Sequence, residues 1–441
     1  MISFKHREVT VKKILKIIVP LLLLLFAAAY IFVPGVQSWP QQNFALSGNG
    51  TGAFSALGRT ESLYLRQVIT ADSTVSRTIA WHSEETAAGA MVELRLKGTE
   101  ELQTVPAVSE KFTDDKITHY LHKVTLTGLK PAAKYEYRIG YGRKRSPWFD
   151  LTTAGEGAFK ALIFPDSQSN DYRNWEKLAQ TAGKTHPDAA FFVNMGDLVD
   201  NGEEHSQWRA WFGALHGIID RIPIAPLLGN HETYDLNWKV RMPVAYLKYF
   251  ELPPNGSAER RNQFYSFDHG NVHFVVLNTQ LAEMEQLQPG LLAAQKEWLQ
   301  KDLAGTKKKW KVALMHKDVL QYSFKHKAGR KPGISDLGKA FMPLFDEYGI
   351  DLVLSAHLHT YRNRGKIYDF KPDERGPVYI VTGVAGNVRY PDLWQRHPFD
   401  LTLAPQPETD NYLTLEASED RLLVQAFLPN GTQFDRVEIT K

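Results

Sequence analysis

The segment that most constrains this sequence runs from Phe191 to Gly202 (Phe-Phe-Val-Asn-Met-Gly-Asp-Leu-Val-Asp-Asn-Gly). Its apolar start predicts a buried strand, and that strand ends at two carboxylates, Asp197 and Asp200, before a glycine turn. Acidic residues directly after a buried strand lie at the rim of an α/β sheet, where such folds bind their ligands. One such strand end is weak evidence, because an Asp there often only caps the next helix.

Four further apolar runs also end in residue types that bind metals. The residues that follow these runs are Asp166 and Gln168 after 159–165, Asn230 and His231 after 222–228, His316 after 310–315, and His357 and His359 after 351–355. The chain contains no cysteine, so any metal must be held by nitrogen and oxygen ligands. Carboxylate, amide and imidazole groups in this number suit two divalent ions of manganese, iron or zinc. Two such ions can share a carboxylate, generate hydroxide at neutral pH and clamp a phosphoryl group.

The order of these blocks resembles the calcineurin-like metallophosphoesterase family over roughly residues 158–390. The specific blocks are Gly196-Asp-Leu-Val-Asp200 and Gly229-Asn-His-Glu232, followed by the lone His316 and the pair His357-Leu-His359. With the β domain that precedes them, the architecture looks most like the purple acid phosphatase branch. The resemblance implies a phosphoesterase in which metal-bound hydroxide attacks phosphorus directly, without a covalent enzyme intermediate.

The resemblance also implies a role for each matching position. One metal would be held by Asp166, Gln168, Asp197 and His359, and a second by Asp197, Asn230, His316 and His357. His231 would contact the phosphoryl group and donate a proton. We expect the Asp200 carboxylate to accept a hydrogen bond from one ring nitrogen of His231, which would fix its tautomer and raise its pKa.

Three positions depart from the family pattern. Gln168 stands where most members have His, which gives a weaker neutral donor to the first metal. Ala356 replaces the Gly that precedes the last His pair, a minor steric change. Asp200 stands where purple acid phosphatases carry a metal-bound Tyr, so the tyrosinate ligand and its ferric ion are not expected here.

The length of 441 residues allows two or three domains, and the pattern of apolar residues changes near Gly155. Short alternating strands before that point predict a small all-β, fibronectin type III-like sandwich over residues 57–154. After it, apolar runs alternate with amphipathic segments, which predicts an α/β domain over residues 155–441. Its fold is expected to be a layered β-sandwich flanked by helices, and the expected helices are 171–182, 203–219, 290–303 and 335–348.

The N-terminus predicts a membrane anchor or a signal peptide. A basic tail at 1–12 precedes an apolar segment at 13–34, and the Gly- and Pro-rich residues 35–56 follow as a linker. Ile17–Val33 is uncharged, just long enough to span a bilayer, although Ala27 and Ala29 form an A-x-A-like cleavage site. We favour an uncleaved anchor, because the apolar run continues past the alanines. In either case the remaining chain lies outside the cytoplasm, and it is secreted if the segment is cleaved.

The sequence thus predicts an extracytoplasmic phosphoesterase with a dinuclear metal site. A phosphodiesterase or nucleotidase of the same fold, and a surface binding module weakened by Gln168, are the alternatives. The expected partner is a phosphate-ester small molecule or a phosphorylated surface component, besides the membrane that holds the N-terminal helix. A net charge of +3 over 441 residues carries no nucleic-acid-binding signature. Loop residues considered for substrate contact are His205, Tyr322, Arg362 and Arg389.

The predicted anchor has a direct test. Because Lys and Arg are concentrated in the residues that precede Ile17–Val33, we expect the N-terminus in the cytoplasm and the rest of the chain outside. Protease added to intact cells should degrade the large domain, and high salt should not extract the protein from membranes. Recovery of the full chain in the cytosolic fraction would contradict this topology.

Overall fold

The computed structural model describes residues 63–85, 88–169, 171–326 and 329–441. The predicted basic tail 1–12, anchor 13–34 and linker 35–56 lie outside these residues, so the anchor stays a prediction. Among the residues that are described, no helix combines the length and the apolar character that a bilayer crossing requires.

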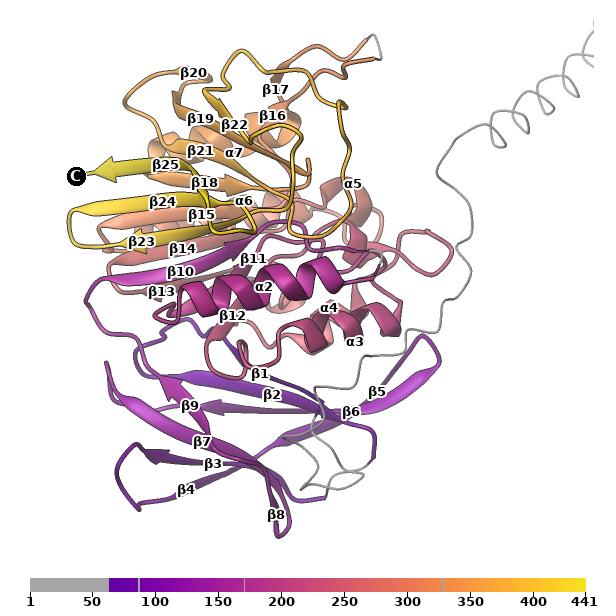
Figure 1. Cartoon of the computed structure of the whole chain (residues 1–441), viewed down its shortest axis with the longest axis vertical. Coiled ribbons are helices and arrows are strands. Elements are labelled where there is room, and N and C mark those ends of the chain that lie inside the picture. Colours follow the sequence, from indigo (N-terminus) through magenta and orange to yellow (C-terminus); the bar gives the residue numbers. More distant parts are fainter. Residues whose placement is uncertain (1–62, 86–87, 170, 327–328) are drawn as a thin grey trace, which may run out of the picture. The chain divides into compact units, whose positions relative to one another are not determined.

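The N-terminal part is the all-β sandwich that the sequence predicts (Figure 1). Its strands are β1 Leu63–Val68, β2 Arg77–Ser83, β3 Ala90–Leu96, β4 Gln103–Pro106, β5 Val108–Asp114, β6 Ile117–Leu126, β7 Lys134–Tyr141, β8 Lys144–Arg145 and β9 Phe149–Thr152. Strands β1, β2, β6 and β5 pair with one another, and β4, β3, β7, β8 and β9 form a second sheet. Trp81, which is fully buried, packs between the sheets with Val92 and Ile139.

The C-terminal part contains two larger sheets. The first continues through β10 Phe159–Phe164, β11 Phe191–Asn194, β12 Pro223–Pro226, β23 Tyr412–Ala417, β24 Arg421–Phe427 and β25 Gln433–Thr440. The second comprises β13 Tyr265–His269, β14 Val272–Leu277, β15 Trp310–Met315, β18 Leu352–Ser355, β19 Thr360–Tyr368, β20 Lys371–Pro372, β21 Val378–Gly383 and β22 Thr402–Leu403. A short pair, β16 Leu320–Gln321 and β17 Gly333–Ile334, stands apart from both sheets.

The helices include the four that the sequence predicts and two short ones that it does not predict, at 244–249 and 281–284. In chain order the helices are α2 Arg173–Thr185, α3 His205–Ala214, α4 Val244–Tyr249, α5 Leu281–Met284, α6 Leu291–Gly305 and α7 Asp336–Glu347, with 3-10 turns at His231–Thr233 and Ala258–Arg260. The one clear error in length concerns α3, which the sequence extends to residue 219. The helix ends at Ala214, and the glycine soon after it, Gly217, takes a left-handed φ of 78° that an α-helix does not allow.

Neighbouring residues of β11 explain the layering. Phe191 packs on Phe274 of the second sheet with ring centroids 5.5 Å apart, whereas Phe192 packs on Trp175 of α2 at 6.2 Å. Side chains alternate along a strand, so the first sheet buries one face on the second sheet and the other on α2 and α3. Helices α6 and α7 cover the outer face of the second sheet. The result is a helix–sheet–sheet–helix stack, which confirms the predicted layered α/β domain (Figure 1).

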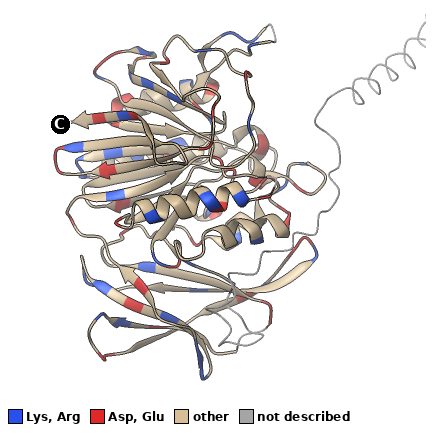
Figure 2. Cartoon of the chain, in the orientation of Figure 1, with Lys and Arg blue, Asp and Glu red and all other residues tan. Residues whose placement is uncertain are grey.

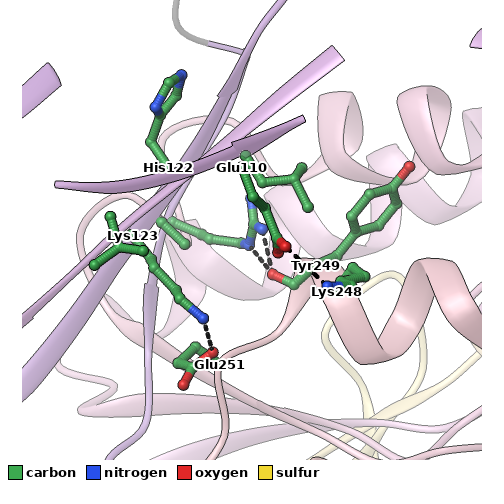
Figure 3. A pocket seen from close by; sticks show the side chains of 10 residues that line it. Glu110, His122, Lys123, Lys248, Tyr249 and Glu251 are labelled. Carbon is green, nitrogen blue, oxygen red and sulfur yellow. Dashed lines mark hydrogen bonds and ion pairs between the residues drawn. The ribbon is translucent and has the colours of Figure 1, made fainter. Parts of the chain in front are cut away.

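The first sheet also joins the two parts of the chain, which the sequence does not predict. Strand β1 of the sandwich pairs in parallel with β12, Val68 opposite Ile224, so one sheet of ten strands runs through both parts. Next to this junction, Lys123 and Glu110 of the sandwich form ion pairs with Glu251 and with Lys248 of α4, at 2.6 and 2.8 Å (Figure 3). The pairing of β1 with β12 covers the strand edge that β12 would otherwise expose.

Charged side chains follow no single-sign pattern along this fold. Figure 2 shows Lys and Arg interspersed with Asp and Glu on strands, helices and loops of both parts. This distribution agrees with the small net charge of +3. The strongest local concentration of ionisable groups is instead buried, at the carboxyl ends of the central strands.

Candidate metal centre

Five strand ends meet where the two sheets converge. Strands β10, β11, β12, β15 and β18 are each followed by the residues predicted from the sequence, which are Asp166, Gln168, Asp197, Asp200, Asn230, His231, His316, His357 and His359. Backbone bonds tie the ends together: the amides of Ala385 and Gly386 donate to the Asp166 carbonyl at 2.8 and 3.0 Å. The amide of Ala356 donates to the His316 carbonyl at 2.8 Å. The site therefore rests on paired strands of both sheets.

Two groups of metal-ligating side chains lie within this cluster. In each group the ligand atoms lie within 4.8 Å of one another; one group is Asp197, His316 and His357, and the other is Asp166, Asp197 and His359. Asp197 belongs to both groups. The two groups therefore suit a dinuclear metal site in which one carboxylate is shared. The order and the chemistry of the residues at the strand ends predict the same arrangement.

The tautomers of two histidines are suited to metal binding. His316 donates from Nδ1 to the Met195 carbonyl at 2.9 Å, and His359 donates from Nδ1 to the Val388 carbonyl at 2.7 Å. Each bond leaves the Nε2 lone pair for the cluster, where His316 Nε2 lies 3.1 Å from Asp197 Oδ2 and His359 Nε2 lies 3.5 Å from Asp166 Oδ1. A backbone acceptor on the far nitrogen is the usual way in which proteins orient a metal-binding imidazole.

Three of the ligand candidates have unusual backbone conformations. Asp197, His357 and His359 have φ values of 48°, 68° and 51°, in the left-handed region that residues other than glycine seldom occupy. Such conformations cost about 1–3 kcal/mol each and persist only where the surrounding structure imposes them. Three such residues lie in one cluster. This indicates that the backbone here is constrained to position the side chains, at a cost in stability.

Gln168 and Asn230 add neutral oxygens to the cluster. Gln168 Oε1 is buried and has no hydrogen-bond partner among the residues that the structure describes. Its amide nitrogen donates to Asp200 Oδ1 at 3.5 Å, a long bond that leaves Oε1 turned away from that carboxylate. Asn230 Oδ1 lies 3.3 Å from His316 Nε2. A buried acceptor without a donor is costly, and a cation would satisfy it, so the donor set fits metal ions.

The charges of the cluster are mutually dependent. Burial opposes a charge on His316, but the carboxylate of Asp197 raises the pKa of His316 to about 9. Burial also opposes the charge of Asp197, yet His316, His231 and His357 keep the pKa of Asp197 well below its usual range. Burial lowers the pKa of His357, which favours the neutral, metal-binding form. A divalent cation would replace the His316 proton, so its binding should release protons.

His231 and Asp200 lie together, but not as the sequence predicts. His231 Nδ1 donates to the backbone carbonyl of Asp200 at 2.6 Å, while the nearest oxygen of the Asp200 carboxylate is 3.6 Å away. The prediction that the carboxylate accepts this bond is therefore wrong, because the turn after β11 brings the main chain of Asp200 closer to the ring. Burial would lower the pKa of His231, but the charges of Asp197 and Asp200, together with this hydrogen bond, raise it.

Glu232 connects the two loops that carry the central ligands. Its carboxylate accepts hydrogen bonds from four amides, those of Gly229 at 2.7 Å, Leu198 at 2.8 Å, Asp197 at 3.1 Å and Val199 at 3.3 Å. The loops pack so closely that a β-carbon on Gly229 would overlap the Asp197 carboxylate. This role of Glu232 was not predicted, although its position in the Gly-Asn-His-Glu block was a signal.

Residues outside the predicted set also border the site. The ring of Tyr390 lies 4.9 Å from that of His359, and the rings of Tyr234 and Trp238 lie 5.8 and 5.9 Å from that of His231. Isolated aromatic residues in loops carry no signal of this kind in a single sequence.

The four residues considered for substrate contact have other partners, and two of them, His205 at the start of α3 and Arg362 in β19, do not lie in loops. His205 packs on His119 of the sandwich, Tyr322 donates to Asp400, Arg362 lies near Asp400, and Arg389 pairs with Asp410. Tyr322 and Arg362 are both buried. These contacts give no support to a role in substrate binding.

Known proteins share both parts of this chain. The calcineurin-like phosphoesterase family matches residues 159–361, and the purple acid phosphatase N-terminal domain matches residues 64–153. The chain therefore contains a calcineurin-like phosphoesterase domain. More particularly, it carries a purple acid phosphatase N-terminal domain, and its relatives are purple acid phosphatases.

The relatives are distant in sequence. Purple acid phosphatase 15 of Arabidopsis thaliana is 26% identical over 338 residues, which cover 68% of this chain and 60% of that protein. Acid phosphatase type 7 of Homo sapiens is 26% identical over 321 residues, which cover 66% of this chain and 69% of that protein. The chain thus spans less than two thirds of the first of these relatives.

The similarity of fold extends further along the chain. The structure of purple acid phosphatase PPD1 from yellow lupin (Lupinus luteus) has a TM-score of 0.71 and 20% identity, covering 86% of this chain and 74% of that chain. A structure of PhoD has a TM-score of 0.58 and 13% identity, covering 85% of this chain and 88% of that chain. At these identities the structural likeness concerns the fold alone.

The four amide bonds to Glu232 lead to a prediction about metal affinity. Glu232→Gln leaves one acceptor oxygen and turns an NH₂ group toward backbone donors, so the loops of Asp197 and Gly229 should loosen. We expect metal affinity to fall about 10–100-fold, measured by competition with a chelator. Glu204→Gln, whose carboxylate accepts from Ser206 and Gln207, is the matched control and should retain its metals. Unchanged affinity in a folded Glu232→Gln protein would contradict this role.

Proposed function

We propose that this protein is a phosphate-ester hydrolase that uses two divalent metal ions, and that it acts outside the cytoplasm. In this proposal Asp166, Gln168, Asp197 and His359 hold one ion, and Asp197, Asn230, His316 and His357 hold the other. The ions would be manganese, iron or zinc, which accept this mixture of carboxylate, amide and imidazole ligands. Asp200 at the position of the family's tyrosine argues against a tyrosinate–iron centre.

One observation carries the proposal. Asp197 is shared by two groups of ligand atoms, and histidines of both groups, His316 and His359, turn their Nε2 atoms toward carboxylates of the cluster. The same cluster also contains three residues with left-handed backbones and the buried Gln168 oxygen, which has no donor among the described residues. A shared carboxylate between two sets of donors is what a two-metal phosphoesterase needs.

The remaining residues support a division of labour. When bound, the two ions would supply an activated water and neutralise charge on the phosphoryl oxygens. When the ring of His231 is protonated at both nitrogens, its Nδ1 hydrogen is donated to the Asp200 carbonyl, and its Nε2 hydrogen would be available to the departing oxygen. The Asp200 carboxylate, 3.6 Å from the ring, would favour the protonated form through its charge.

Gln168 is the observation that favours a second candidate, a binding module with weak catalysis. A neutral amide binds zinc, manganese or iron less tightly than imidazole does, so the first ion would be lost more readily. Turnover separates the two candidates: metal-replete protein should hydrolyse a panel of phosphate monoesters and diesters well above the rate in solvent. The same panel decides between a monoesterase and a phosphodiesterase or nucleotidase, and the absence of turnover would favour the binding module.

The proton-donor role of His231 predicts a dependence on the leaving group. His231→Ala should slow the hydrolysis of alkyl phosphates by about 10²–10⁴, because an alkoxide cannot depart without a proton. Nitrophenyl phosphate should lose far less, since nitrophenolate departs unprotonated. The ratio of the two rates in wild type and variant is the measurement.

Asp200→Asn is the control for this experiment. The substitution removes the carboxylate charge but keeps the backbone carbonyl that accepts from His231. We therefore expect the same selective loss on alkyl phosphates to be much smaller than in His231→Ala, with metal content unchanged. Equal losses on both classes of ester in His231→Ala would mean that His231 only binds substrate.

A further inference from the structure

The loop Tyr234–Val240, which follows the 3-10 turn that begins at His231, exposes several large apolar side chains. Leu236, Trp238 and Val240 are 45%, 52% and 43% exposed. Single exposed hydrophobic residues are ordinary on protein surfaces, whereas a group of them beside a polar site marks a binding surface. This group adjoins His231, the residue that we propose as the proton donor to the leaving group.

The loop has a defined conformation. Its ends, Tyr234 and Val240, form an antiparallel bridge. Asp235 holds the turn between them, because its Oδ1 accepts from the amides of Asn237 and Lys239 at 2.8 Å each. The Asp235 carbonyl accepts from the side chain of Asn201 at 2.7 Å. These bonds use no part of the Trp238 side chain, so the loop can keep its shape when that ring is replaced.

Trp238 itself has a left-handed backbone, with φ of 59°. For a bulky residue this conformation is a true outlier, and such outliers persist at ligand-binding positions where the structure imposes them. Its amide donates to the Asp235 carbonyl at 2.9 Å, which holds the residue in that conformation. The strained backbone and the half-exposed ring together indicate selection for where the ring lies.

The ring of Trp238 lies beside the ring of His231. Their centroids are 5.9 Å apart and their planes nearly perpendicular, at 88°. Tyr234 contacts both rings, at 5.8 Å from His231 and 5.9 Å from Trp238. If His231 protonates the departing oxygen, the group attached to that oxygen must lie next to His231. Trp238 borders that space and still presents half of its surface to solvent.

We propose that Trp238 is a stacking platform for a planar aromatic group on the leaving alcohol of the substrate. The inference rests on the proposed function, since it takes His231 as the residue at the leaving oxygen. An indole face binds a nucleobase or an aryl ring equally well, because both present a flat π surface. The substrate class is then a phosphate ester of an aromatic alcohol or of a nucleoside.

Two pairs of substrates test the proposal with leaving alcohols of similar acidity. Adenosine 5′-monophosphate and ribose 5-phosphate differ by a nucleobase, and benzyl phosphate and cyclohexylmethyl phosphate differ by aromaticity. Trp238→Ala should raise KM about tenfold for the aromatic member of a pair and leave kcat and the other member unchanged. Trp238→Phe should restore most of the loss. A loss confined to the nucleotide would assign the platform to nucleobases, a loss confined to benzyl phosphate would assign it to aryl groups, and a loss on both would assign it to planar aromatic groups of either kind.

Leu236→Ala is the matched control, because Leu236 is exposed on the same loop but offers no ring. Calorimetric titration with adenosine, which carries no phosphate, gives a readout apart from turnover: its affinity should fall about tenfold in Trp238→Ala. If the wild type bound adenosine through Trp238 but hydrolysed no ester, the proposed function would fail and the platform would stand.

Three results would overturn the platform. The first is an equal loss on both members of each pair, and the second is an equal effect of Leu236→Ala. The third is unchanged selectivity in Trp238→Ala combined with weaker binding to vesicles of anionic phospholipid, which would assign the exposed loop to a membrane surface.

Discussion

The site depends on a single buried carboxylate, that of Asp197, because both groups of ligand atoms require it. An isolated carboxylate in this position would be strongly destabilising, since it is almost fully buried and lies close to Asp166. The imidazole of His316, whose pKa this carboxylate raises to about 9, lies against it, with Nε2 3.1 Å from Oδ2. Metal ions would compensate the charge of Asp197 more completely. The left-handed backbone, the absence of a side chain at Gly229 and the four amide bonds of Glu232 all serve to hold this carboxylate in place.

The fold supplies the rigidity that this carboxylate needs. The ligands follow central strands of two sheets that bury large faces on each other and on helices, so the loops that carry the ligands begin from fixed points. The N-terminal sandwich contributes to the same framework, because β1 extends the sheet beyond β12. It thereby protects the edge of the strand whose next turn carries Asn230 and His231. This arrangement gives the sandwich a structural reason to accompany the phosphoesterase domain.

Features set by local sequence could be predicted, whereas those set by packing between distant segments could not. The central strands were predictable because continuous apolar runs such as 310–315 are typical of buried strands, and the polar residues that follow mark their ends. The pairing of β1 with β12 was not, because no local pattern in either strand identifies its partner.

The same distinction holds within the site. Five of the residues that the sequence assigns to the metals bring ligand atoms together, since strand order and chain direction place them at one edge: Asp166, Asp197, His316, His357 and His359. The acceptor for His231 was predicted as the Asp200 carboxylate and is the Asp200 carbonyl, a difference that depends on a few ångströms of backbone. Trp238 was missed altogether, because its proximity to His231 depends on a turn held by Asp235 rather than on a motif.

The central claim is that Asp197 bridges two metal ions, and the location of the ions tests it most directly. Anomalous scattering from crystals of the protein loaded with Mn²⁺ would locate them without reference to activity. The account predicts two peaks about 3.5–4 Å apart, with one oxygen or both oxygens of Asp197 between them. A single peak, or two peaks of which only one contacts Asp197, would contradict it.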